Sequence, residues 1–383
     1  MTTTQMTTTQ TTTTQVTTTS LIDVRPSVTP LSAVERAALM VDPGFGRVHS
    51  DHMVAIRWST EKGWHDAVLT AYEPLQLDPA AMVLHYGQAI FEGLKAYRQD
   101  DGGVAVFRPR ENSRRFNRSA VRLAMPELPE ELFLGAVEAL VEQDRDWVPT
   151  AAGQSLYLRP FMIATEAQLG MRPAFEYLFL LIAFPVTPFF PGEVKPVTVW
   201  LSDEYVRAAV GGTGEAKCAG NYAGSLLAQR QAADKGCDQV VWLDAVERRW
   251  VEEMGGMNLF FVFAGTDGEP TRLFTPALTG TLLPGVVRDS LLALAPDLGL
   301  VVEQGRISRE QWQQGCEDGS LTEVFACGTA AVIAPVGQAR SAQGDWTVGD
   351  GNAGPVTLAL RAALLDLQYG RRADPQGWMH RIH

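Results

Sequence analysis

A glycine-rich run, GGTGEAKCAGNYAG at residues 211–224, surrounds Lys217, one of only five lysines in the 383-residue chain. Gly212 and Gly214 precede this lysine and Gly220 follows it, and missing side chains let a backbone approach a bulky ligand. A partly desolvated lysine amine loses its proton readily and attacks an aldehyde to form a Schiff base. The run matches neither a P-loop nor G-x-G-x-x-G. On spacing alone, Lys217 is either a Schiff-base lysine or an ordinary lysine in a flexible surface loop.

The other four lysines have ordinary settings in the sequence. Lys62 lies in a polar turn, and Lys195 precedes a proline. Lys235 lies near an expected helix end, and Lys95 accompanies an apolar stretch typical of a strand. Lys217 alone has the glycine-lined surroundings that a covalently bound ligand needs.

If Lys217 holds an aldehyde cofactor such as pyridoxal phosphate, three further groups are needed. A carboxylate must keep the ring nitrogen protonated, N–H groups or an arginine must bind the phosphate, and other donors must bind the substrate carboxylate. Glu253 precedes two glycines and a strand, and Val286 and Val287 begin a helix with their N–H groups free. Small residues after Cys327 predict a turn that a ligand can approach. Taken singly, these features also fit a solvated strand end, a simple helix start and a tight turn.

The elements expected around these residues alternate between strands and helices. Helical periodicity covers 131–148, and β-rich or apolar runs predict strands at 104–107 and 177–184. Further along the chain we expect strands at 197–201, 239–244 and 258–264 and helices at 221–235, 285–295 and 355–368. This alternation is typical of an α/β fold in which the Lys217 loop leads into a helix.

Two segments without expected regular structure divide the chain. The first 20 residues form an uncharged Thr/Gln repeat that cannot bury enough surface to offset its ordering entropy. Residues 1–30 are therefore predicted to be a disordered tail, and the proline-rich stretch 185–196 is a candidate interdomain linker. We expect three further parts, with a cofactor in the cleft between the domains. These are a small N-terminal domain at 31–187, a linker at 188–196 and a large C-terminal cofactor-binding domain at 197–383.

Composition excludes several classes of function. The net charge is −12 and no basic stripe is present, so nucleic acid is not an expected partner. The longest apolar run, 177–184, is about strand-sized, which predicts no membrane partner, and the N-terminus does not resemble a signal peptide. The four cysteines show neither metal-ligand spacing nor a paired framework. We therefore expect reduced thiols, no bound metal and a cytoplasmic location.

Eight segments resemble, in their order and spacing, the branched-chain amino acid aminotransferases, which are pyridoxal-phosphate enzymes of fold type IV. The resemblance covers about residues 35–378. The segments are LHYGQAIFEGLKAYR (84–98), FRPRENSRRFNRSAVRLAMP (107–126), SLYLRPFMIATEAQLGM (155–171), the Lys217 loop, EMGGMNLF (253–260), LPGVVRDSLL (283–292), EVFACGTAA (323–331) and LQYGR (367–371).

The resemblance implies pyridoxal 5'-phosphate as cofactor, an α+β small domain beside a larger α/β domain, and an active site in the interdomain cleft. It also implies a homodimer whose active sites are completed by the neighbouring subunit. The implied reaction is reversible amino transfer between L-leucine, L-isoleucine or L-valine and 2-oxoglutarate, so the partners are small amino acids and 2-oxo acids.

Three alternatives share parts of this pattern. D-amino acid aminotransferases and aminodeoxychorismate lyases have the same fold with the same lysine and glutamate. A non-catalytic pyridoxal-phosphate carrier is the alternative of another class. Tyr157, Arg159 and the FEGLKAYR stretch favour the branched-chain enzyme, and the full set of acid, base and substrate-side groups disfavours the carrier.

The resemblance assigns the cofactor-binding residues one by one. Lys217 is implied to be the Schiff-base lysine and the proton shuttle between the substrate Cα and the cofactor C4′. Tyr222 is implied to hydrogen-bond the phenolic oxygen of the cofactor, and Glu253 its pyridinium nitrogen. The phosphate is implied to be bound by Arg115, Val286, Val287 and Thr329.

The substrate-binding residues follow in the same way. The N–H groups of Thr329 and Ala330, with the Tyr157 hydroxyl, are implied to bind the α-carboxylate. Arg159 is implied to bind the distal carboxylate of glutamate, and a structural ion pair within the small domain is the alternative. The aliphatic pocket is implied to consist of Phe91 and, from the neighbouring subunit, Tyr86, Leu169 and Met171.

The chain departs from the family pattern at three places. Phe189 stands where some members have a tyrosine, and Gly256 where some have a threonine, which leaves the substrate preference open. Residues 331–334 replace the Cys-x-x-Cys of some animal members, so no thiol switch is expected there.

Overall fold

Two nine-stranded sheets form the fold of the computed structural model, which describes residues 21–188, 193–265 and 269–383. The strands of the first sheet are β1 (Asp23–Val24), β2 (His52–Ser59), β3 (Gly63–Ala71), β4 (Ala89–Phe91), β5 (Leu94–Arg98), β6 (Val104–Phe107), β7 (Ser155–Ala164), β8 (Glu176–Val186) and β18 (Met379–Ile382). The helices in this part of the chain are α1 (Ala33–Leu39), α2 (Met82–Tyr86), α3 (Pro109–Arg122), α4 (Glu130–Gln143) and the 3₁₀ turn η2 (Arg145–Trp147).

The second sheet comes from the following part of the chain. Its strands are β9 (Val197–Ser202), β10 (Gln239–Leu243), β11 (Val251–Met254), β12 (Met257–Phe263), β13 (Arg272–Pro276), β14 (Val301–Gly305), β15 (Leu321–Gly328), β16 (Val332–Ser341) and β17 (Gly344–Thr347). The helices are α5 (Ala219–Ala223), α6 (Leu226–Asp234), α7 (Val286–Leu294), α8 (Arg309–Glu317), α9 (Pro355–Gln368) and the 3₁₀ turn η3 (Ala295–Leu298).

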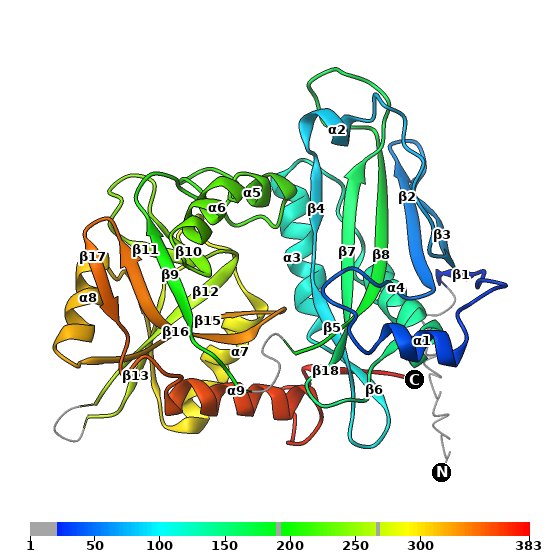
Figure 1. The fold of residues 1–383 in the computed structure, drawn as a ribbon. Coiled ribbons are helices and arrows are strands. Elements are labelled where there is room, and N and C mark those ends of the chain that lie inside the picture. Colours follow the sequence, from blue (N-terminus) through cyan, green and yellow to red (C-terminus); the bar gives the residue numbers. More distant parts are fainter. Residues whose placement is uncertain (1–20, 189–192, 266–268) are drawn as a thin grey trace, which may run out of the picture.

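The two sheets lie side by side, with α3 and α5 between them and α9 running below the junction (Figure 1). The first sheet has the order β1-β3-β2-β8-β7-β5-β6-β18, with β4 paired to β7, and is antiparallel apart from the β1–β3 pair. The second has the order β11-β10-β9-β16-β15-β12-β13-β14, with β17 paired to β16, and is mixed. This architecture confirms the predicted α/β class of fold type IV.

Helix α3 lies between the two sheets and has an apolar stripe beside a polar one. Phe116 and Ala120, four residues apart, are fully buried in the core of the first sheet, where the Phe116 ring lies 5.6 Å from that of Phe179 on β8. Arg115 and Ser119 lie on the adjacent stripe of the helix and are also buried. The polar atoms of Arg115 and Ser119 contact residues of the second half of the chain. One stripe of α3 therefore packs into the core of the first sheet, and the adjacent stripe forms hydrogen bonds to the second half of the chain.

Several expected elements are confirmed, and two helices end earlier than expected. The strand at 104–107 and the helix at 355–368 have the predicted bounds. The helix expected at 221–235 is interrupted, because Gly224 has low helix propensity and the Ser225 hydroxyl donates to the Tyr222 carbonyl. The helix expected at 131–148 ends at Gln143 and continues as η2.

The prediction of a disordered tail over residues 1–30 is wrong for the last part of that range. Residues 1–20 lie outside the described residues. Strand β1 pairs in parallel with Val68–Leu69, and Ile22 is buried in the core of the first sheet. The first apolar residues after the Thr/Gln repeat therefore bury enough surface to order the chain.

The chain crosses between the two sheets twice. The predicted linker at 188–196 separates β8 from β9, and Phe189 within it lies outside the described residues. Residues 379–382, which we expected in the large domain, form β18 and pair with the edge strand β6 of the first sheet. Among the described ranges, no helix combines the length and apolarity needed to cross a membrane.

Candidate active site

Lys217 lies in the loop before α5, where the two halves of the chain meet. Its N–H donates to the hydroxyl of Ser119 on α3 at 2.9 Å, and its carbonyl accepts from the N–H of Phe91 on β4 at 3.0 Å. Its Nζ donates to the hydroxyl of Tyr222 on α5 at 2.6 Å. The backbone of the lysine is thus held by the first half of the chain, while its amine meets the Tyr222 hydroxyl.

Gly214 of this loop cannot carry a side chain, because its backbone lies too close to neighbouring residues. A Cβ atom on Gly214 would lie 2.3 Å from the carbonyl oxygen of Thr281 and 2.7 Å from the Cβ of Ala208. Arg207 donates to the carbonyls of both Gly214 (3.0 Å) and Thr281 (2.6 Å). The glycine-rich run is therefore packed against the segment before α7, which disfavours the alternative of a flexible surface loop.

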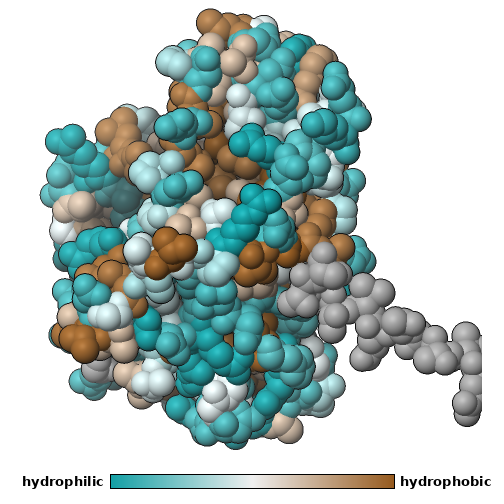
Figure 2. Space-filling model, turned by 90° about the vertical axis from the view of Figure 1, so that its right-hand side faces the viewer, coloured by the Kyte–Doolittle hydropathy of each residue, from teal (hydrophilic) through white to brown (hydrophobic). Residues whose placement is uncertain are grey.

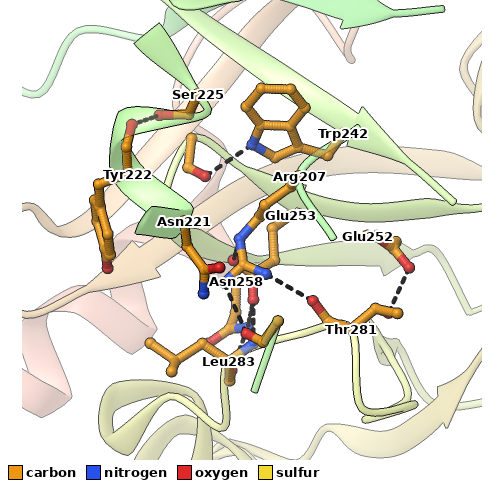
Figure 3. Close-up of polar contacts among 12 residues, drawn as sticks. Arg207, Asn221, Tyr222, Ser225, Trp242, Glu252, Glu253, Asn258, Thr281 and Leu283 are labelled. Carbon is orange, nitrogen blue, oxygen red and sulfur yellow. Dashed lines mark hydrogen bonds and ion pairs between the residues drawn. The ribbon is translucent and has the colours of Figure 1, made fainter. Parts of the chain in front are cut away.

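Glu253 on β11 is held at the other side of the site (Figure 3). Its Oε1 accepts from the N–H of Leu283 and from Asn258, the latter at 3.4 Å. Its Oε2 lies 3.0 Å from Nε of Arg207 in a buried ion pair, yet it accepts no hydrogen bond. Burial raises the pKa of Glu253, although Arg207 and the Leu283 N–H oppose this shift. One buried carboxylate oxygen is therefore free to accept a hydrogen bond.

Arg115 on α3 is oriented by a second buried carboxylate, Glu92. Its Nε and Nη2 donate to the two oxygens of Glu92 at 2.7 and 2.8 Å, and its Nη1 donates to the Pro284 carbonyl at 3.1 Å. Burial alone would raise the pKa of Glu92, but the charge and hydrogen bonds of Arg115 hold it below its usual value. Both side chains are almost inaccessible to solvent. Because each Nη carries two N–H bonds, one on each nitrogen stays available to another acceptor.

Two backbone segments border the same region. Helix α7 begins at Val286 after Gly285, where a Cβ would lie 2.1 Å from Oδ1 of Asn258. The N–H groups of Val286 and Val287 belong to the first turn and lack intrahelical acceptors. The turn between β15 and β16 contains Thr329, whose hydroxyl donates to the Gly93 carbonyl at 3.1 Å.

The predicted substrate-side residues Tyr157, Arg159 and Phe91 also meet at the site. Arg159 on β7 donates to the Tyr157 hydroxyl at 3.4 Å, and its guanidinium lies 4.9 Å from the centre of the Phe91 ring. Its Nε is buried without a hydrogen-bond partner. Within the described ranges, no carboxylate oxygen lies within 4.0 Å of Arg159, which disfavours the alternative of a structural ion pair.

One cavity of about 200 Å³ joins these groups. The predicted residues that line it are Phe91, Arg115, Tyr157, Arg159, Lys217, Tyr222, Val286, Val287, Thr329 and Ala330. The carboxylate of Glu253 contacts two further lining residues, Asn258 and Leu283. The structure does not bring Tyr86, Leu169 and Met171 to this cavity. These three side chains are 42%, 57% and 90% exposed on the surface near α2.

A larger hollow, of about 680 Å³, lies beside β18 and the first turn of α3. Charged side chains that line it are paired with one another, as in the contacts of Glu138 with His380 and of Arg114 with Glu111. It lacks the lysine, the hydroxyl and the free carboxylate oxygen that meet around Lys217.

Sequence reasoning missed five residues of the site. These are Phe45, Glu92, Lys95, Arg207 and Asn258. Phe45 lies in an irregular segment and reaches the cavity through ring contact with Tyr157, 5.2 Å between centroids. Glu92 and Lys95 lie within the quoted FEGLKAYR stretch, where charged residues among apolar ones were an available signal. Asn258 lies within the quoted EMGGMNLF stretch, whereas Arg207 lies outside every quoted stretch and its partner Thr281 is 74 residues away in the chain.

The comparisons with known proteins agree with this geometry. Residues 89–339 match the family described as amino-transferase class IV. A probable branched-chain-amino-acid aminotransferase of Streptomyces coelicolor is 59% identical over 94% of this chain and 98% of its own length. The crystal structure of the Escherichia coli branched-chain amino acid aminotransferase aligns with a TM-score of 0.70 at 29% identity, over 86% of this chain and 99% of the other.

A second crystal structure, of the T.th. branched-chain amino acid aminotransferase with pyridoxamine 5'-phosphate, aligns with a TM-score of 0.69 at 30% identity, over the same shares of the two chains. The expected family, reaction class and cofactor are thereby confirmed. The chain belongs to the class IV aminotransferases and, among them, to the branched-chain-amino-acid aminotransferases that use pyridoxal phosphate.

Proposed function

We propose that the cavity around Lys217 is where this aminotransferase exchanges the amino group between L-leucine, L-isoleucine or L-valine and 2-oxoglutarate. The observation that carries the proposal is the meeting of the Lys217 amine and the Tyr222 hydroxyl in one cavity, behind whose wall a carboxylate is buried. That carboxylate, Glu253, contacts the lining residues Asn258 and Leu283, and its Oε2 is paired with Arg207 but accepts no hydrogen bond. Pyridoxal phosphate bound there supplies an electron sink for the negative charge that develops at the substrate Cα.

The residues fit this cofactor at four points. Lys217 supplies the amine for the aldehyde, and Tyr222, already hydrogen-bonded to that amine, supplies a donor for the phenolic oxygen. Glu253 Oε2 needs a hydrogen-bond donor, which a protonated ring nitrogen provides, and that positive charge opposes the rise of the Glu253 pKa caused by burial. Arg115 and the first-turn amides of α7 supply donors for a phosphate.

In this proposal, Lys217 is the residue that transfers the proton. With the cofactor and a substrate bound, the Nζ of Lys217 would accept the proton from the substrate Cα and deliver it to the cofactor C4′. Its backbone is fixed at both the N–H and the carbonyl, so the side chain alone has to move. Its hydrogen bond to Tyr222 gives the displaced amine a defined resting position.

Substrate recognition is proposed to combine an apolar wall with one cation. Tyr157, Thr329 and Ala330 line the cavity, and the proposal assigns the α-carboxylate to the Tyr157 hydroxyl and the N–H groups of Thr329 and Ala330. Phe91 and Phe45 supply apolar surface for an aliphatic side chain. Arg159 is half-buried over the Phe91 ring, and its Nε is buried without a hydrogen-bond partner, a cost that an anion in the cavity would offset. We therefore assign the distal carboxylate of glutamate to Arg159.

Replacing Arg159 with methionine is expected to separate the two substrate classes. The Michaelis constants for glutamate and 2-oxoglutarate should rise far more than that for leucine, because only the former bring a second carboxylate. The difference should be about 2–4 kcal/mol, the cost of leaving a buried charge without its partner. Steady-state kinetics of both half-reactions measure it, and Arg159→Lys, which keeps a charge, should fall between the two. Equal losses for leucine and glutamate, together with a lower melting temperature, would instead identify Arg159 as structural.

We further propose a homodimer in which Tyr86, Leu169 and Met171 complete the apolar pocket of the neighbouring subunit. With Leu84, which is 59% exposed, they form an apolar surface around α2 and the loop that follows β7. Figure 2 shows apolar side chains (brown) at the top of the molecule, where α2 lies in Figure 1, and in the hollow below it. Monomers rarely leave such a patch uncovered. Sedimentation should show a dimer in wild type and a shift toward monomer in a Leu84→Glu/Met171→Glu double variant.

Incubation of the purified protein with leucine and 2-oxoglutarate tests the proposed reaction, and glutamate should form. Production of glutamate from D-alanine instead, or of pyruvate from aminodeoxychorismate, would favour the two alternatives of the same fold. Binding of the cofactor without turnover of any of these substrates would favour a carrier. The cytoplasmic location stays a prediction, and all four cysteines are free in the structure.

A further inference from the structure

Phe184 of β8 packs against Tyr157, the tyrosine of β7 that lines the cavity. The two residues lie directly opposite each other on neighbouring strands, and their rings stack with 4.9 Å between centroids and 17° between planes. Phe184 is buried and lies outside the cavity wall. It can therefore act on a substrate only through the residues that it contacts.

The Tyr157 ring depends on packing for its position. Its hydroxyl accepts one long hydrogen bond, from Arg159 at 3.4 Å, and a bond of this length is weak. The hydroxyl lies over the backbone of Gly93, where an added Cβ would be 1.9 Å from the oxygen. The close approach to Gly93 on one residue and the stack on Phe184 therefore restrict where the ring can lie.

Phe45, the lining residue that belongs to no helix or strand, packs against the same ring. It meets Phe184 edge to face at 5.2 Å and 81°, and Tyr157 at 5.2 Å and 73°. Gly44 and Gly46 on either side of it have φ angles of 63° and 67°, in the region that glycine adopts readily. The flanking backbone restricts Phe45 little, so its ring contacts decide its position in the cavity wall.

We infer that Phe184 is a positioning residue for both parts of an amino-acid substrate. Through Tyr157 it orients the hydroxyl assigned to the α-carboxylate, and through Phe45 it holds apolar surface assigned to the aliphatic side chain. The inference rests on the proposed function, which makes those two assignments. Without the ring at position 184, a substrate has to order Tyr157 and Phe45 as it binds, and the entropy lost in that ordering weakens binding.

The simpler alternative is that Phe184 only stabilises the first sheet, and Phe179 is the matched control for it. Phe179 lies five residues earlier on β8, is fully buried, and packs against Phe116 of α3 and Phe133 of α4. Successive residues of a strand point to opposite faces, so Phe179 and Phe184 lie on opposite faces of the sheet. Phe179→Leu therefore removes the same atoms from the core on the other face.

Steady-state kinetics of the holoenzyme separate the two roles. Phe184→Leu should raise the Michaelis constants for leucine and glutamate by about 5- to 50-fold, through the loss of two aromatic contacts, and should change kcat far less. Phe179→Leu should lower the melting temperature at least as much and leave both constants near those of wild type. Unchanged constants in Phe184→Leu, or equal increases in the two variants, would overturn the inference. Absence of transamination in wild type would instead refute the proposed function.

Binding of 4-methylpentanoate to the holoenzyme gives a measurement that does not depend on turnover. This carboxylate has the branched chain but no amino group, and calorimetry should show it bound more weakly by Phe184→Leu by about the same 5- to 50-fold. If Phe184→Leu does not fold, Phe184→Met keeps an apolar side chain without a planar ring and should show the same loss. Wild-type affinity in the folded variant would contradict the inference.

A double-mutant cycle tests whether Phe184 acts through Phe45. The increases in the Michaelis constant for leucine caused by Phe45→Ala and by Phe184→Leu should multiply to at least about twice the increase in the double variant, as expected for residues that share a contact. Phe45→Ala combined with Phe179→Leu should instead give the product of the single effects. A full product for the Phe45 and Phe184 pair would show that the two rings act independently and would overturn the inference.

Discussion

Lys217→Ala is expected to abolish transamination between leucine and 2-oxoglutarate and to leave a protein that no longer retains its cofactor after borohydride reduction. The physical reason is that no second amine among the described residues meets the same set of groups. Lys217 lies beside Tyr222 in the cavity, whose lining residues Asn258 and Leu283 contact the carboxylate of Glu253. Because the Lys217 amine is both the covalent nucleophile and the general base, its removal should lower kcat by several orders of magnitude.

The matched control is Lys235→Ala, which removes an exposed lysine at the end of α6 and should keep full activity. Mass spectrometry of the reduced wild-type protein should place the cofactor on the peptide that contains Lys217. Lys95 is the informative competitor, because it is also buried near the cavity and its pKa is lowered to about 7. Its Nζ is directed to the Ala330 carbonyl, so a reduced adduct on Lys95 would overturn the assignment.

Glu253→Gln is expected to bind the cofactor and to lose turnover by about 10²- to 10³-fold, the usual effect of one oriented electrostatic contact. An amide occupies the same space and can still accept from the Leu283 N–H, but it cannot hold a proton on the ring nitrogen. The electron sink is then weakened in the step that removes the proton from the substrate Cα. Stopped-flow measurement of each half-reaction, with cofactor content determined by absorbance, separates loss of chemistry from loss of binding.

Glu252→Gln is the control for this variant. Successive residues of a strand point to opposite faces, and Glu252 accepts instead from the hydroxyl of Thr281 (Figure 3). Its turnover should stay within a few-fold of wild type. If Glu253→Gln turns over at a near-normal rate while Glu252→Gln is slow, the two carboxylates have exchanged roles; if both variants are fast, no carboxylate assists the ring nitrogen.

Local sequence was sufficient to single out candidates for some of the key groups. The glycine-rich run singled out Lys217, and the helix start before Val286 was visible because it depends on residues adjacent in the chain. The strand at 104–107 and the helix at 355–368 were predicted with their observed bounds, since periodicity and helix boundaries are local properties. The individual roles of Tyr222, Arg115 and Tyr157 came from resemblance to the family, and they stay predictions that the variants above test.

Tertiary structure alone decided what surrounds those groups. Lys95 looked like an ordinary strand lysine, yet it is buried behind the turn that contains Ala330, which lies 235 residues further along the chain. Arg207 likewise became part of the site through its contacts with Glu253 and Thr281. Burial, counter-ions and the direction of a free hydrogen-bonding atom depend on segments that meet only on folding, so no window of sequence contains them. The sequence by itself determined which chemical groups this protein has for transamination, and the packing of its two sheets decided which of them are buried, paired and directed at one another.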